Sequence, residues 1–158
     1  ETVMKSYTAL ASRIQTELEN LETAVNRALE LGNKAKASGD DGYWDGVALN
    51  LHGYYSGVEH IFEDIARTVE DASPSGSNWH TDLLTQMSNE VDGVRPRVIL
   101  DETRIALDEF RGLRHIIRNV YAFNLRPARL DKLLSQLPHS FETVRSDLMK
   151  FIQFLESV

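Results

Sequence analysis

Hydrophobic residues recur every three or four positions along almost the whole chain, which is the spacing of one face of an α-helix. The first run predicts a helix over about residues 3–36 and consists of Tyr7, Leu10, Ile14, Leu18, Leu21, Val25 and Leu29. A glycine-containing turn at residues 38–42 ends this helix. The second run predicts another long helix and consists of Val47, Leu51, Tyr54, Val58, Ile61, Ile65 and Val69. Two long helices joined by a short turn predict an antiparallel hairpin.

A short helix is expected after the loop at residues 71–77. Asn78 is a suitable N-cap for it, because asparagine side chains accept hydrogen bonds from the first backbone amides of a helix. The apolar residues of this segment are Trp79, Leu83, Leu84 and Met87. We expect Trp79 to anchor the preceding loop in the core.

Two more helices complete the prediction. Asp101 is a candidate cap for a helix that runs to about Asn124, and Pro127 suits the first turn of a last helix. Pro138 would kink or restart that last helix. No segment alternates between apolar and polar residues as a strand does. The sequence therefore predicts an all-α bundle of about five helices with a long N-terminal hairpin, folded as one domain over residues 1–158.

Composition excludes several classes of chemistry. The chain has 158 residues, 42% of them hydrophobic, which is enough for one well-filled core. It contains no cysteine, so disulfides, thiolate nucleophiles and cysteine-bound metals are excluded. No apolar run approaches the length of a membrane-spanning helix. We expect a cytoplasmic protein that does not associate with a membrane.

The charge of the chain is unevenly distributed. The net charge is −7, yet residues 110–130 contain five arginines and no Asp or Glu. A helix over residues 110–123, with about 100° between successive residues, places Arg111, Arg114 and Arg118 within about 60° of one another. The same face carries His115, Asn119 and Tyr121. Like charges at these spacings repel and do not stabilise a helix, so the arrangement favours the binding of an anion.

Two interpretations of this arginine face remain open from spacing alone. In one, the arginines form ion pairs with the acidic residues of the second helix, such as Glu59, Glu63 or Asp64. In the other, the face binds a phosphodiester, because the planar guanidinium of Arg114 donates paired hydrogen bonds to phosphate. A neighbouring imidazole would then move the proton of a ribose 2′-hydroxyl, which makes RNA cleavage without a metal chemically feasible.

Other candidate sites are weak. His52 and His60 lie eight residues apart, whereas metal-binding histidine pairs on a helix prefer a spacing of three or four. The acidic turn at residues 40–45 lacks the alternating oxygen ligands and closing glutamate of a calcium loop. No glycine-rich phosphate loop is present. We expect neither a metal nor a cofactor.

The segment from Arg114 to Tyr121 resembles the motif of HEPN-superfamily ribonucleases, Arg-x4-6-His, which in HepT toxins reads Arg-x4-His-x-Tyr. The flanking segments 54–62, 74–80 and 121–125 are also similar to a HepT-like branch. This resemblance implies the toxin half of a toxin–antitoxin pair, a metal-independent ribonuclease (a hydrolase-class nuclease) that forms a homodimer. Its implied partner is an MNT-type nucleotidyltransferase antitoxin, which would attach AMP to the motif tyrosine, Tyr121 here. The added negative charge would occupy the place that the RNA substrate needs.

The chain departs from that motif at one position, because Asn119 stands where the family has its histidine. An amide forms hydrogen bonds but is neither a general acid nor a general base near neutral pH. Under the ribonuclease hypothesis the catalytic residues are Arg114, Asn119 and His115, with His115 as the proton carrier and Asn119 as an orienting group. Arg111 and Arg118 would extend the RNA-phosphate track. The alternatives are a catalytically degenerate HEPN domain that binds an acidic partner, a nucleotide or RNA, and an engineered His→Asn change.

Overall fold

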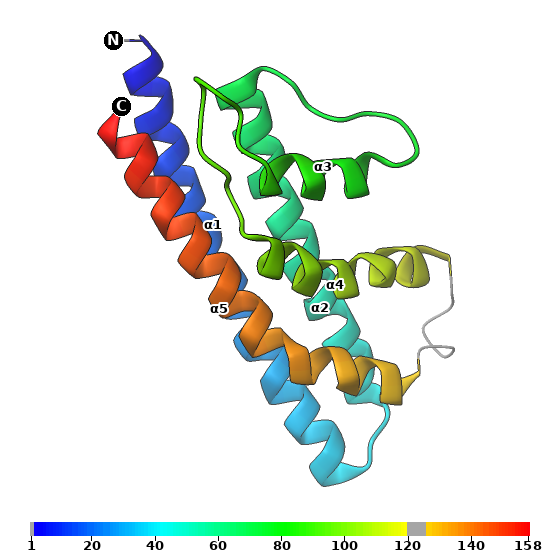
Figure 1. The fold of residues 1–158 in the computed structure, drawn as a ribbon. Coiled ribbons are helices and arrows are strands. Elements are labelled where there is room, and N and C mark those ends of the chain that lie inside the picture. The colour runs from blue at the N-terminus through cyan, green and yellow to red at the C-terminus, as the bar shows by residue number, and fades with distance from the viewer. Residues whose placement is uncertain (1, 120–125) are drawn as a thin grey trace.

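The computed structural model describes residues 2–119 and 126–158, and the side chains of the fourth helix as far as Leu113. These residues form five α-helices, α1 (Thr2–Ser38), α2 (Gly42–Ile65), α3 (Trp79–Ser88), α4 (Asp101–Asn119) and α5 (Pro127–Ser157). One π-helical turn, η1 (Ala66–Glu70), extends α2. No strand is present in the described parts of the chain, so the predicted all-α class is confirmed (Figure 1).

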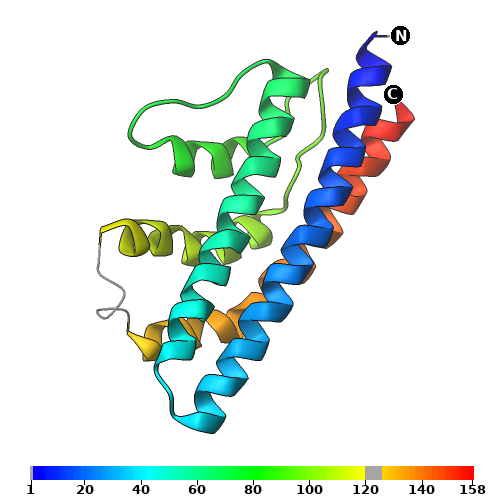
Figure 2. The ribbon, with the colours of Figure 1, turned by 180° about the vertical axis from the view of Figure 1, so that it is seen from behind.

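The predicted hairpin of α1 and α2 is the longest element of the fold (Figure 2). The residues of the two predicted runs are buried, except Leu29 and Val69, which are half-buried. The two helices approach closely at Gly57, where an added Cβ would lie 2.6 Å from a methyl carbon of Leu21. Further along α1, a Cβ at Gly32 would collide with the side chain of Leu134 of α5. Glycine at both positions therefore sets the helix spacing.

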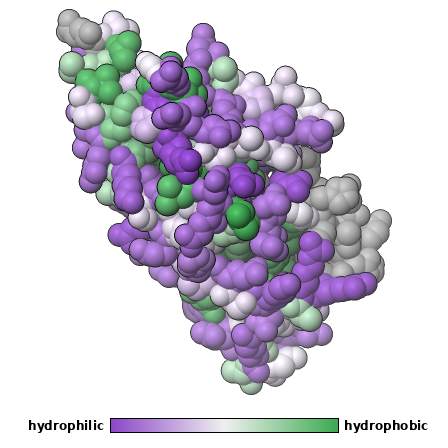
Figure 3. All heavy atoms as spheres, in the orientation of Figure 1, coloured by the Kyte–Doolittle hydropathy of each residue, from purple (hydrophilic) through white to green (hydrophobic). Residues whose placement is uncertain are grey.

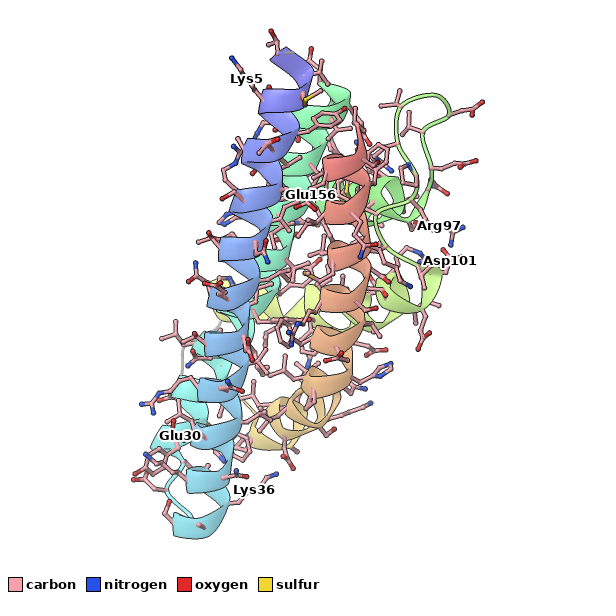
Figure 4. The ribbon with its side chains drawn as sticks, turned by 90° about the vertical axis from the view of Figure 1, so that its left-hand side faces the viewer. Lys5, Glu30, Lys36, Arg97, Asp101 and Glu156 are labelled. Carbon is pink, nitrogen blue, oxygen red and sulfur yellow. The ribbon has the colours of Figure 1, made fainter. Side chains whose placement is uncertain are left out.

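The last helix runs beside α1 in the opposite direction, so the first and last helices lie together along one side of the bundle (Figures 1 and 4). An ion pair of 2.7 Å between Lys36 and Asp131 joins them near the start of α5. Pro127 occupies the first turn of α5, as predicted. Pro138 lies inside a continuous helix and does not restart it, and the ribbon changes direction in this part of α5.

The two shorter central helices, α3 and α4, project from α2 toward the side away from α1 (Figures 1 and 2). The rings of Tyr54 and Phe110 pack edge to face with centroids 5.6 Å apart, which joins α2 to α4. The hydroxyl group of Tyr54 also hydrogen-bonds to that of Ser140 at 2.9 Å. One aromatic side chain of α2 thus contacts both α4 and α5.

The N-terminus of α4 is held by a carboxylate from α5. Asp147, which is 6% exposed, accepts hydrogen bonds from the backbone N–H of Leu100 at 3.0 Å and from the hydroxyl of Thr103 at 2.5 Å. The prediction that Asp101 caps this helix is wrong, because Asp101 is the first residue inside α4 and pairs with Arg104 at 3.7 Å. A side chain 47 residues away satisfies this helix end instead.

Asn78 lies at the N-cap position of α3, as predicted, but its side chain makes no capping hydrogen bond. Trp79 packs against the core, as expected for a loop anchor. The loop between α3 and α4 is organised by Arg95, which is 4% exposed. Its guanidinium binds the carboxylate of Glu70 and donates to the backbone carbonyls of Gln86, Asn89 and Pro96. This buried cation therefore fixes the loop that leads into α4.

Candidate functional site

The predicted site residues lie in the second half of α4. The backbone of this helix is described to its end, and it includes Arg111, Arg114, His115, Arg118 and Asn119. Tyr121 lies outside the described residues, as does the predicted extension of the helix to Asn124. The structure therefore gives the helical register of the motif up to residue 119 and the side-chain environment of Arg111.

The register of α4 relates the arginine face to the core. Thr103, Leu107 and Phe110 are at most 1% exposed and follow one another at intervals of four and three residues. The next buried residue in this series is Leu113, three positions after Phe110, which is 1% exposed. Arg114 follows Leu113 directly along the backbone of α4, about 100° further round the helix.

Arg111 already has a carboxylate partner. Its Nε donates to Asp108, one turn earlier, at 2.7 Å, and the arginine side chain is 43% exposed. The hydrogen bond to Asp108 raises the pKa of Arg111 above its ordinary value. A phosphate at Arg111 would therefore share this guanidinium with Asp108 or displace it.

The acidic residues suggested as partners of the arginine face have other partners. Asp64 receives two hydrogen bonds from Arg13 of α1, at 2.8 and 2.9 Å, and these lower the pKa of its carboxyl group. Glu63 lies 3.9 Å from Arg67. Glu59 is bonded to His80 of α3 at 2.5 Å. Each of these three carboxylates thus has a described partner, and because the side chains of Arg114 and Arg118 lie outside the described ones, the ion-pair interpretation stays a prediction.

A polar cluster lies beside α4 that the sequence interpretation did not assemble. Glu59 is only 2% exposed and binds His80, whose side chain is 23% exposed. Tyr55, one turn earlier on α2, is 1% exposed. Burial and then the charge of Glu59 raise the pKa of Tyr55 well above its ordinary value, while Arg111 opposes this shift. Glu59, Tyr55 and Arg111 therefore belong to one electrostatic environment.

A signal for this cluster was present in the sequence. Glu59 lies four residues after Tyr55 and three before Phe62, so it shares the core-facing side of α2 with two aromatic residues. A carboxylate at such a position needs a hydrogen-bonding partner, because an unpaired buried charge is strongly destabilising. The spacing of residues along α2 shows that Glu59 requires a partner, but it does not identify His80 as that partner.

Neither a metal site nor a membrane span is found in the described parts of the chain. No three His, Cys, Asp or Glu side chains there are grouped as metal ligands would be. No described helix combines the length and hydrophobicity that crossing a bilayer requires. The face shown in Figure 3 is mostly hydrophilic and carries only small, separated hydrophobic areas.

Comparison with known proteins gives one result. The family described as HepT-like protein matches residues 46–155, which includes most of α2 and α5 and all of α3 and α4. The chain belongs to the HepT-like family. Neither the curated proteins nor the solved structures contain a match. In this HepT-like protein of the HEPN superfamily, the matched region contains the whole Arg114–Tyr121 segment and the Glu59–His80 pair.

Proposed function

We propose that this HepT-like protein is the toxin of a HEPN/MNT toxin–antitoxin pair and acts as a metal-independent endoribonuclease in the cytoplasm. The family match over residues 46–155 is the observation that carries the proposal, because it covers the motif helix and the helices that position it. The concentration of arginine in the second half of α4 supports a polyanionic substrate.

The proposed site forms where two copies of the chain bring their α4 helices together. Arg114 binds the scissile phosphate and stabilises the charge that develops on it. Asn119 positions the ribose or phosphate through hydrogen bonds, and His115 is the proton carrier assigned from the sequence. Arg111 and Arg118 lengthen the phosphate track. The net charge of −7 would then disfavour RNA binding elsewhere on the surface.

Regulation in this proposal occurs at Tyr121. An MNT-type nucleotidyltransferase transfers AMP to its phenol oxygen, which places a phosphate close to Arg114 in sequence and on the same helix face if the helix continues. The modified side chain competes with RNA by charge and by bulk.

A second function is favoured by one residue. Asn119 replaces the motif histidine, and this change removes a proton-transfer group while it leaves the arginines in place. A catalytically degenerate HEPN domain that binds RNA, a nucleotide or an acidic partner would have this composition. The two functions differ in whether bound RNA is cut.

The deciding experiment incubates the purified protein with total RNA and with transfer RNA in the presence of EDTA. Arg114→Ala and Asn119→His variants are tested in parallel. The ribonuclease proposal expects cleavage by the unmodified protein and none by Arg114→Ala. Binding without cleavage by the unmodified protein, together with cleavage by Asn119→His, would establish the degenerate domain instead. Silence of all three would exclude ribonuclease activity for this chain on these RNAs.

A further inference from the structure

An arginine from another helix lies against the motif helix. Arg129 belongs to the first turn of α5 and is exposed. An added Cβ at Gly112 of α4 would lie only 3.3 Å from a guanidinium nitrogen of Arg129. Figures 1 and 2 agree that the start of α5 and the second half of α4 lie on the same side of α2. The guanidinium of Arg129 therefore lies over the backbone of α4, at the residue that follows Arg111.

Gly112 permits this close approach. Its backbone is helical and does not adopt the left-handed conformation that favours glycine. Inside a helix, glycine is the least favourable residue after proline, so helix stability does not account for its presence in α4. A side chain larger than that of alanine would take the place of the Arg129 guanidinium. The contact between Arg129 and α4 is thus the structural effect of glycine at this position.

The guanidinium of Arg129 forms no ion pair with the described side chains. Two carboxylates close to it in the two helices are bound by other cations. Asp108 of α4 binds Arg111 at 2.7 Å, and Asp131 of α5 binds Lys36, also at 2.7 Å. A positive charge in the first turn of a helix is also unfavourable, because the helix dipole is positive there. Neither ion pairing nor helix stability therefore accounts for Arg129.

We infer that Arg129 is a further phosphate-binding residue for single-stranded RNA, a role that rests on the proposed function. Its guanidinium and that of Arg111 lie at neighbouring points on the exposed side of α4, because Gly112 follows Arg111 directly. One RNA strand carries a negative charge at every nucleotide, so two such neighbouring arginines bind successive phosphates. A phosphate at Arg111 competes with Asp108, whereas a phosphate at Arg129 displaces no carboxylate.

The test measures binding of a fluorescently labelled 2′-O-methyl RNA oligonucleotide as a function of salt concentration. This probe has no free 2′-hydroxyl, so it is bound without being cut. The variants are Arg129→Ala and Gly112→Leu, with Arg145→Ala as the matched control. Arg145 is also an exposed arginine of α5, and it lies further along the helix. Cleavage of ordinary RNA in EDTA and thermal melting are measured for the same proteins.

We expect Arg129→Ala to weaken binding about tenfold at low salt, because the loss of one hydrogen bond between charged groups has this size. The slope of log affinity against log salt concentration should fall by about 0.7, which corresponds to one phosphate contact on a single strand. Gly112→Leu should weaken binding to a similar degree and raise the melting temperature, because leucine fills the place of the guanidinium and favours the helix. Arg145→Ala should change binding by less than about twofold.

Unchanged binding by Arg129→Ala, or equal losses in Arg129→Ala and Arg145→Ala, would overturn the role of Arg129. Cleavage by the unmodified protein would in that case leave the ribonuclease proposal standing. Normal binding by Gly112→Leu would overturn the placement of Arg129 over α4 as the cause of its effect. Selective weakening in Arg129→Ala without cleavage by any protein would support Arg129 and overturn the ribonuclease. If the unmodified protein neither binds nor cuts RNA, both proposals fail.

Discussion

Replacing Asp147 by alanine should weaken the attachment of α4 to the bundle. The carboxylate accepts hydrogen bonds from Leu100 N–H at 3.0 Å and from the Thr103 hydroxyl at 2.5 Å, and both Asp147 and Thr103 are buried. A hydrogen bond to a charged group contributes about 1.5 kcal/mol or more to stability, so the two bonds amount to about 3 kcal/mol. Alanine recovers about 0.5 kcal/mol through its higher helix propensity. We therefore expect the free energy of unfolding to fall by about 2–3 kcal/mol.

Urea denaturation followed by far-UV circular dichroism measures this change directly. For a protein of this size, the same loss lowers the melting temperature by roughly 5–10 °C. Glu142→Ala, at an exposed position on the same helix, is the control for helix propensity. Thr103→Val removes one of the two bonds, and the double variant should show coupling of about 1 kcal/mol between the two sites.

A loss below about 0.5 kcal/mol, or one equal to that of Glu142→Ala, would refute this reasoning. It would mean that the apolar contacts of Leu107 and Phe110 hold α4 without help from the carboxylate.

Three further predictions concern other parts of the molecule. The hydrogen bond from Arg13 lowers the pKa of Asp64 in the folded state. The bond therefore stabilises the protein above the unfolded-state pKa of about 3.9, and this stabilisation is lost as the pH falls through the lower folded-state pKa. Arg13→Ala should therefore lower the free energy of unfolding by less than about 1 kcal/mol near pH 7 and leave it unchanged in strong acid. Urea titrations at both pH values measure this difference. An equal loss at both pH values would contradict the assignment. Gly57→Ala should destabilise the hairpin by about 1 kcal/mol or more, because the added Cβ would collide with Leu21. Gly53→Ala should stabilise the protein in the same urea titrations, because its Cβ would have no neighbour within 4 Å and alanine has the higher helix propensity. Under the proposed function, Tyr121→Phe should gain no AMP in mass spectrometry after incubation with an MNT-type nucleotidyltransferase and ATP, and a mass gain equal to that of the unmodified protein would place the modification elsewhere.

The sequence predicted the helices because the interior of this fold is built almost wholly from residues at helical spacing. The hairpin, the first turn of α5 at Pro127 and the anchoring of Trp79 follow from local patterns and were confirmed. Pairings between distant polar side chains were not predicted, since periodicity carries no information about which helices meet. The bonds of Asp147 to α4 and of Glu59 to His80 are of this kind.

The sequence likewise predicted the helix that carries the candidate site, but not how that helix faces the rest of the bundle. The spacing of the arginines identified the motif helix, and the family match includes that helix. The helical wheel gave the relative angles of the side chains, but it did not show which direction faces the bundle. Buried Thr103, Leu107, Phe110 and Leu113 supply that direction for the part of α4 whose side chains the structure describes.

The attachment of α4 to Asp147 has a consequence for the order in which this protein matures during synthesis. Residues 1–70 contain all of the α1–α2 hairpin, so this part can pack as soon as it leaves the ribosome. The carboxylate that holds the start of α4 emerges only with the last dozen residues of the sequence described here. We therefore expect the arginine-rich helix to dock only after Asp147 has emerged, so that an RNA-cutting site of the kind proposed would be assembled well after the hairpin. Pulse-labelling hydrogen exchange during refolding would show this order as protection of α1 and α2 before α4, and simultaneous protection would exclude it.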